Sequence, residues 1–238
     1  MDYTKIIEDA FEYSKEGLLV RGGRWLKLIL ALILLTLPLL GYSMRIYRGA
    51  TPAPEVDGWG KLFIDGIKLL VLGLVYSIPL TIVWLIAYAG LINATLSGQL
   101  TSWEQVITSS MGLQPAIGLL ALMYILEIIL LILVPIATIR LARTNSFAAA
   151  FNIGAILEYI GKIGWLTYIL ALLLISIVVG FAVFILGFVI ALGVYLISSS
   201  LIATLLASGV LLLIIMPPVQ VFRARYFTQV YDSVAPAE

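Results

Sequence analysis

The chain has 238 residues, of which 62% are hydrophobic and only 11% are charged, whereas soluble domains carry about 25% charged residues. This composition excludes an ordinary water-soluble domain, and a formal net charge of +1 gives no basis for binding nucleic acid. The absence of cysteine and histidine excludes disulfides, metal ligation by Cys or His and Ser-His-Asp catalysis.

Residues 1–22 predict an amphipathic helix. Apolar residues recur at helical spacing on one face, and acids and lysines occupy most of the other. Two lysines against five acids give this segment a net negative charge, so we expect it to pack against the protein's own loops. It does not resemble a cleavable signal peptide, because some twenty largely polar residues precede the first apolar run.

Apolar segments make up most of the remaining chain. Uncharged runs longer than about 18 residues are typical of transmembrane helices. We therefore expect an all-α fold, with a single integral membrane domain over residues 1–238, about five crossings and additional interfacial amphipathic helices. The turn between the last two crossings is expected between Gly187 and Ser200, at Gly193 or in the serine run 198–200. The apolar segments are residues 25–44, 67–93, 114–139, 164–187 and 201–222.

The first apolar segment leaves two alternatives open. Between Lys27 and Arg45 lie 17 uncharged residues, about 26 Å of helix, which is just enough to cross the membrane. A re-entrant segment would place all 14 basic residues on one side, which the charge distribution favours. A hairpin tip would, however, leave backbone amides in lipid unless protein covers them. We therefore expect a full crossing here.

Two arginine pairs suggest an internal repeat. Arg45-x-x-Arg48 recurs 95 residues later as Arg140-x-x-Arg143, and each pair follows an apolar segment that contains a proline. The repeat would relate residues 25–93 to residues 114–187. The alternative is that membrane helices commonly end in arginine, whatever their origin.

Basic residues also predict the orientation. Every Lys and Arg from Arg45 onward falls on one side of the expected crossings, so the positive-inside rule places the arginine-pair loops in the cytoplasm. Arginines at this level either bind lipid phosphates or serve as anchors. The candidates are Arg45, Arg48, Arg140, Arg143, Arg223 and Arg225.

Several of these residues belong to a wider resemblance. Gly41-Tyr42 with Arg45 and Arg48, Trp59-Gly60, the run 65–70, Arg143 and the run 147–151 resemble an uncharacterised, mainly archaeal membrane family, the domain-of-unknown-function 4013 family. The resemblance implies a polytopic helical fold in the plasma membrane of an archaeal cell. It implies no activity.

Glu127 is the one acid in the middle of an expected crossing. A charged side chain at this depth costs roughly 2.5–3.5 kcal/mol on insertion scales, and no basic residue lies at a similar depth. The acid is then either neutral and hydrogen-bonded to hydroxyls between helices, or part of a proton- or cation-binding site. The polar residues considered with it are Tyr124, Thr81, Ser176 and Ser208.

These patterns favour a binding protein over an enzyme. We find no phosphate loop, no paired carboxylates at hydrolytic spacing and no metal cluster, so we expect no catalytic, cofactor or metal site. The expected function is non-enzymatic, through membrane lipids or a protein partner. The small residues Gly180 and Gly187 predict close helix packing inside the chain, and the alternative is a self-association face for a second copy of the chain. The alternative is a small proton- or cation-coupled transporter or channel that uses Glu127.

Overall fold

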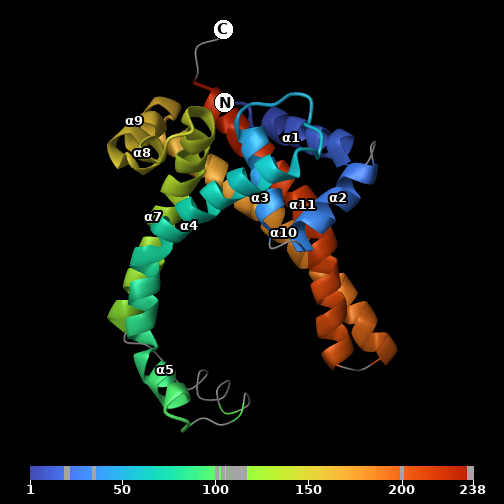
Figure 1. The fold of residues 1–238 in the computed structure, drawn as a ribbon, viewed down its shortest axis with the longest axis vertical. Coiled ribbons are helices and arrows are strands. Elements are labelled where there is room, and N and C mark those ends of the chain that lie inside the picture. Colours follow the sequence, from blue (N-terminus) through green and yellow to red (C-terminus); the bar gives the residue numbers. More distant parts are fainter. Residues whose placement is uncertain are drawn as a thin grey trace. The chain divides into compact units, whose positions relative to one another are not determined.

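The computed structural model describes residues 1–18, 22–33, 36–99, 102, 105, 117–198 and 201–234, and its regular structure there is entirely helical (Figure 1). Three of these helices are long and apolar enough to cross a membrane, namely α4, α7 and α10. The predicted all-α membrane fold is therefore confirmed. The helices are α1 (Tyr3–Leu18), α2 (Gly22–Ile33), α3 (Leu37–Tyr47), α4 (Trp59–Ala87), α5 (Ala89–Leu96), α7 (Ile117–Thr144), α8 (Phe147–Phe151), α9 (Ile153–Ile163), α10 (Trp165–Ser198) and α11 (Leu201–Asp232).

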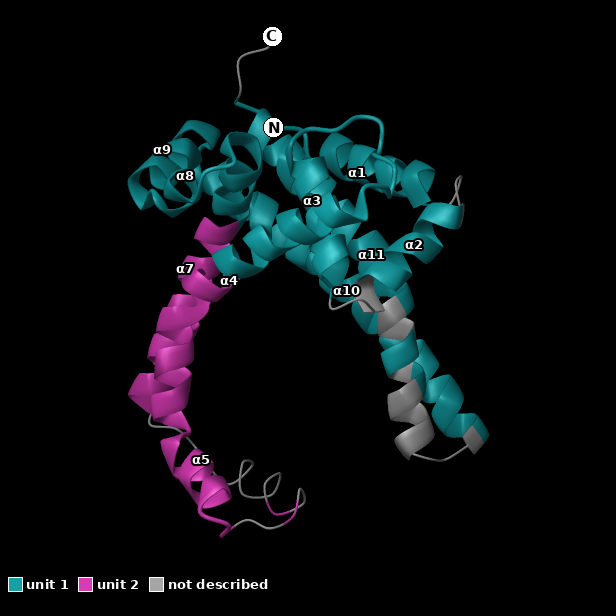
Figure 2. Ribbon diagram, viewed as in Figure 1, with its two compact units in different colours: residues 1–72, 135–238 teal, residues 73–134 magenta. Residues whose placement is uncertain are grey.

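The chain forms two compact units (Figure 2). The first contains residues 1–72 and 135–238, and the second contains residues 73–134. In the second unit, many large apolar side chains of α4 and α7 are exposed, among them Leu74, Ile78 and Ile128. Apolar exposure of this extent is expected of helices that face lipid.

The C-terminal part of α11 forms the centre of the first unit. It contacts α1, α3 and α10, and its side chains Val221, Ala224 and Tyr226 are fully buried. The Tyr226 hydroxyl donates a hydrogen bond of 2.9 Å to the Ala171 carbonyl on α10, which gives the buried phenol a partner. Apolar burial around α11 therefore holds the N-terminal helix, α3 and α10 together.

The stretch 25–44 is not the single continuous helix that the sequence predicts. It consists of α2 and α3, which contact each other and which, with 12 and 11 residues, are each too short to cross a membrane. Helix α3 begins after Thr36, whose φ of 66° is left-handed, and Pro38 is its second residue. A proline has no N–H to donate to a preceding helical turn, so it is tolerated in the first turn of a helix and marks the start of α3 here.

Helices α3 and α4 approach each other at backbone distance. A Cβ atom on Gly41 would overlap the Leu62 carbonyl oxygen, and one on Gly66 would overlap the Leu37 carbonyl oxygen. Only glycine permits this approach. Both glycines lie in the motifs that carry the family resemblance, so these motifs record helix packing.

The structure also places other helix boundaries differently from the sequence prediction. The expected apolar segment 67–93 does not begin a helix of its own, because residues 59–87 form one helix, α4, of 29 residues. Helix α10 continues past Gly193 to Ser198, so the turn before α11 does not fall at Gly193. The serine alternative stands, although residues 199–200 lie outside the described part.

Candidate functional site

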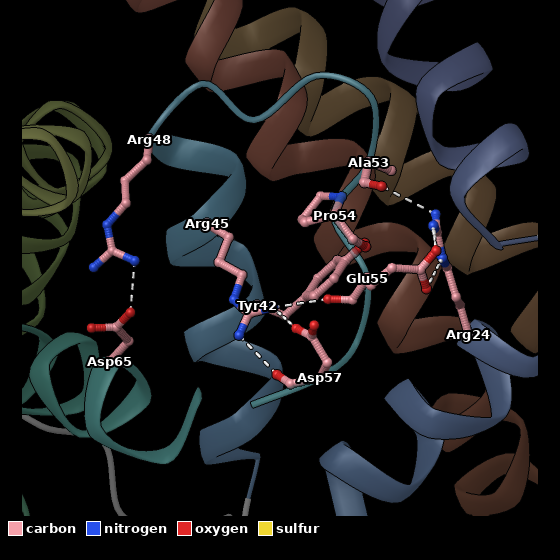
Figure 3. A network of polar contacts seen from close by, with 9 residues as sticks. All are labelled: Arg24, Tyr42, Arg45, Arg48, Ala53, Pro54, Glu55, Asp57 and Asp65. Carbon is pink, nitrogen blue, oxygen red and sulfur yellow. Dashed lines mark hydrogen bonds and ion pairs between the residues drawn. The ribbon is translucent and has the colours of Figure 1, made fainter. Parts of the chain in front are cut away.

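Two arginines from different helices bind the loop between α3 and α4, residues 49–58, which we call the connecting loop (Figure 3). Arg24, at the start of α2, is 7% exposed, forms an ion pair with Glu55 and donates 3.1 Å to the Ala53 carbonyl. Arg45, in the last turn of α3, donates 2.8 Å to the Glu55 carbonyl and forms a 2.6 Å ion pair with Asp57.

The binding of both arginines to the connecting loop constrains the directions of α2 and α3 relative to each other. A straight helix would separate Arg24 from Arg45 by about 31 Å, since each residue adds about 1.5 Å. Instead both arginines contact Glu55, one through its carboxylate and one through its carbonyl. Helix α2 therefore leads away from the connecting loop and α3 leads back to it, so that the two helices form a helical hairpin.

The second arginine of each pair binds the end of the other pair's helix. Arg48 Nε donates 3.2 Å to the Ala142 carbonyl of α7, and Arg143 Nε donates 2.7 Å to the Tyr47 carbonyl of α3. The contact is reciprocal and obeys the 95-residue spacing at both of its residues. Each guanidinium satisfies one of the carbonyls that a helix leaves without a partner at its C-terminus.

The first arginine of each pair binds a carbonyl further along the chain. Arg45 reaches the Glu55 carbonyl, and Arg140 Nε donates 3.0 Å to the Ala149 carbonyl in α8. These contacts span ten and nine residues. The two pairs thus have matching roles, with the first arginine closing the following segment and the second joining the two helices.

A sixth arginine ties α1 to the same loop. Arg225 of α11 donates 2.8 Å to the Asp9 carboxylate and 3.0 Å to the Thr51 hydroxyl, and its guanidinium lies 4.7 Å from the Tyr13 ring centroid. The Tyr13 hydroxyl donates 2.8 Å to the Ala50 carbonyl, and burial raises its pKa above the ordinary tyrosine value. We call Arg24, Arg45, Arg48, Arg140, Arg143 and Arg225 the arginine layer.

A basic pocket opens beside this layer. It has a volume of about 500 Å³ and combines four basic side chains with one acid. Three helix ends contribute to it, namely the C-terminal ends of α3 and α7 and the first turns of α4. Its lining residues are Arg48, Lys61, Asp65, Lys68, Ala142, Arg143 and Asn145.

Asp65 is the internal counter-ion of the pocket. It is 2% exposed, and its two carboxylate oxygens face different cations: Oδ2 lies 2.6 Å from Arg48, and Oδ1 lies 3.6 Å from Lys68. Lys68 also donates 2.7 Å to Asn145 Oδ1. Asn145 has a φ of 53°, the left-handed conformation that commonly follows a helix.

Lys61 differs from the other cations of the pocket. Its side chain is exposed, and we find no hydrogen bond or ion pair between it and any other residue in the described ranges. Positions 61, 65 and 68 lie on one face of α4, since residues four and seven apart share a helix face. Lys61 therefore faces the pocket without an ion-pair partner among the described residues, although its charge interacts favourably with the nearby Asp65 carboxylate.

The structure brings together most of the predicted lipid-phosphate residues. Five of the six lie in the arginine layer. Arg223 of α11 is exposed, and no hydrogen bond or ion pair is found for it within the described part of the chain. The pocket residues Lys61, Lys68 and Asn145 were not predicted, although the spacing of the two lysines around Asp65 was visible in the sequence.

The predicted intramembrane residues are divided between the two units, with Glu127, Tyr124 and Thr81 in the second and Ser176 in the first. Glu127 and Tyr124 are both exposed on α7, and Thr81 lines a shallow apolar groove on α4. Ser176 donates 2.8 Å to the Leu172 carbonyl of its own helix. The Ser208 side chain lies outside the described part. The role of Glu127 stays a prediction.

The small residues predicted to pack helices have no close neighbour. A Cβ atom on Gly180 or Gly187 of α10 would meet no described atom within 4 Å. Among the described residues, no close helix contact inside one chain accounts for the presence of these two glycines. A second copy of the chain stays a prediction.

Together these features define a helical membrane protein with a layer of arginines and a basic pocket at the ends of its helices. The chain belongs to the family described as "Protein of unknown function (DUF4013)", which matches residues 26–192. The match runs from α2 into α10 and includes both arginine pairs. No curated protein and no solved structure matched the chain.

Proposed function

We propose that the chain is a non-enzymatic protein of the plasma membrane whose arginine layer, together with the exposed Arg223 of α11, lies at the cytoplasmic surface and binds anionic lipid headgroups. Helices α4, α7 and α10 and the apolar first half of α11 cross the membrane. The hairpin α2–α3 enters it and returns to the same side. The resemblance to a mainly archaeal family supports the membrane of an archaeal cell.

The observation that carries this proposal is the sharing of Glu55 by Arg24 and Arg45. Because both ends of the hairpin lie at one level, α1 and every later basic residue stay on the same side of the membrane. All 14 basic residues then obey the positive-inside rule, which a full crossing over residues 25–44 would violate.

The objection to a re-entrant segment is the exposure of backbone amides to lipid at its tip. Within the first unit, α2 contacts both α3 and α11. The indole of Trp25 donates 3.1 Å to the Ile214 carbonyl of α11, which fixes α2 against a longer helix. Protein therefore lies beside the hairpin, and this is the condition under which re-entrant segments are tolerated.

Lipid-dependent thermal unfolding tests the proposal. The full chain in neutral detergent is mixed with phosphatidylglycerol or phosphatidylcholine, and the Tm is followed by tryptophan fluorescence. We expect phosphatidylglycerol to raise the Tm by several degrees more than phosphatidylcholine does. The difference should shrink in 1 M NaCl, where the Debye length is about 3 Å.

A pair of variants makes the test specific. Arg223→Gln removes an exposed arginine of the basic side and should reduce the response to phosphatidylglycerol. Lys5→Gln removes an exposed charge of the acidic helix α1 and should leave the response unchanged. Equal Tm shifts with both lipids in the parent chain would overturn the proposal.

A further inference from the structure

We infer that the basic pocket at the ends of α3, α4 and α7 is a binding site for one phosphate group. The phosphate belongs either to a lipid headgroup or to a small soluble phosphate, and the same donors serve both. The inference rests on the proposed function only for the lipid source, because the pocket itself is defined by its side chains.

The first argument is charge. Four cations line the pocket against one carboxylate, so three positive charges remain uncompensated among the lining residues. Asp232 compensates one of them through its 2.8 Å ion pair with Arg143. Partly buried like charges repel one another more strongly than in water, and an anion between them offsets that cost.

The second argument is the identity of the donors. Arg48 and Arg143 provide guanidinium groups, which suit the tetrahedral oxygens of phosphate, and Lys61 and Lys68 provide mobile ammonium groups. These donors come from three helix ends. The exchanged carbonyl bonds of Arg48 and Arg143 join α3 to α7, and the ion pair between Arg48 and Asp65 joins α3 to α4. The site is therefore built before any ligand arrives, which lowers the entropic cost of binding.

The arrangement does not suit a cation. Asp65 is the only acid of the lining, and both of its oxygens already face basic groups. No group of three acidic side chains able to hold a metal ion occurs in the described ranges. A metal ion would also face the four surrounding cations.

Size and position agree with a phosphate that carries a further group. A volume of about 500 Å³ lies within the roughly 300–1,000 Å³ of small-molecule sites, and it exceeds what one phosphate fills. In the proposed orientation the pocket lies at the level of the arginine layer, where lipid headgroups lie. A glycerophosphate headgroup therefore matches the remaining space.

Titration calorimetry of the detergent-solubilised full chain tests the inference with two probes, inorganic phosphate and dihexanoyl phosphatidic acid. Binding of both with similar Kd indicates a free-phosphate site, and clearly tighter binding of the lipid indicates a headgroup site. Either result supports a phosphate site. If neither probe binds, the inference is overturned.

Three variants assign the binding to the pocket. Lys61→Gln removes a cation that holds no other described residue, so folding should persist while Kd rises roughly tenfold, the value of one charge-assisted hydrogen bond. Asp65→Asn removes the internal counter-ion and should tighten binding, provided that the variant keeps its folded elution profile. Lys162→Gln is the matched control, because Lys162 pairs with Glu158 on α9 outside the pocket.

The outcomes separate this inference from the proposed function. If Lys61→Gln and Lys162→Gln weaken binding equally, the pocket is not the site, and the inference falls. If phosphatidylglycerol stabilises the parent and Lys61→Gln equally while the calorimetric probes fail to bind, the lipid-binding arginine layer stands without the pocket. Binding of phosphate without any preference for anionic lipid would support the phosphate site in the pocket and overturn the proposed function.

Discussion

Buried charge is the central feature of the first unit at the scale of single residues. Arg24 is 7% exposed and Asp65 is 2% exposed, and both have ion-pair partners. Removal of one partner from a buried pair typically costs about 3–5 kcal/mol, because the remaining charge stays desolvated. These pairs fix the positions of the connecting loop and of α4 more than they add stability, since intact buried pairs gain little over apolar packing.

Glu127 differs from these buried, paired charges. It is an exposed acid on a helix able to cross a membrane, and no hydrogen bond or ion pair is found for it among the described residues. Nothing in α7 itself offsets the cost of a charge in lipid, so we expect an uncharged amide to replace this side chain without loss of folding.

The variant Glu127→Gln tests this expectation. We expect its Tm in detergent to stay within about 2 °C of the parent, because loss of one hydrogen bond in a membrane averages about 0.6 kcal/mol. Proton flux in reconstituted vesicles should be absent from both proteins. Flux in the parent that Glu127→Gln abolishes would show that the transporter alternative is correct.

At the scale of secondary structure, the close approach of α3 to α4 is decided by two glycines. Gly66→Ala places a methyl group against the Leu37 carbonyl oxygen, so the helices must separate and the connecting loop must move. We expect a loss of about 1–3 kcal/mol, read as a lower Tm in detergent.

The control for Gly66→Ala lies on the same helix. A Cβ atom on Gly60 would meet nothing within 4 Å, so Gly60→Ala should leave the Tm unchanged or raise it slightly through helix propensity. Equal losses in the two variants would mean that the approach of α3 to α4 does not matter for stability.

The arginine exchange bears on the predicted repeat. Tyr47 and Arg48 contact Ala142 and Arg143 reciprocally, as two equivalent units do when a local twofold axis relates them. The acidic partners break the pattern, because Arg48 pairs with Asp65 whereas Arg143 pairs with Asp232, and these acids are not 95 residues apart. The repeat stays a prediction that the reciprocal contact supports.

The sequence predicted the long helices well because uncharged runs of membrane length have few alternatives. It did not predict the division of residues 25–44 into α2 and α3, since hydropathy measures how apolar a stretch is and not where a helix ends. Thr36 and Pro38 carried the signal for the turn, yet a proline near a helix end is also compatible with a mild kink. The proposed hairpin rests on the binding of Arg24 and Arg45 to one loop, and periodicity within a segment does not reveal such a contact.

The pocket could be predicted only in part. Five of the six predicted arginines lie in one layer, because basic residues gather at the ends of membrane helices for a general reason. Their role in binding lipid stays a prediction. The partners were missed because Ala142, Asn145 and Lys61 meet through tertiary packing. Hydrogen bonds to backbone carbonyls, such as that from Arg143 to Tyr47, leave no side-chain pattern in the sequence.

At the scale of the whole molecule, the proposed topology differs from a simple five-helix bundle. In this proposal the hairpin α2–α3 does not change sides, and four crossings by α4, α7, α10 and the first half of α11 follow it. The proposal therefore places both termini and all the arginines on one side of the membrane. The first unit already ties α1 to the C-terminal helix through Asp9 and Arg225.

Single-cysteine labelling tests this claim most directly, because the chain has no cysteine of its own. Glu12→Cys on α1, Glu158→Cys on α9 and Ser97→Cys after α5 each replace an exposed residue. A membrane-impermeant maleimide is applied to intact cells or spheroplasts and to inverted vesicles. We predict that the cysteines at 12 and 158 react only in inverted vesicles and that the cysteine at 97 reacts only in intact cells. Reaction at 12 from the same side as 97 would contradict the account, because residues 25–44 would then cross the membrane.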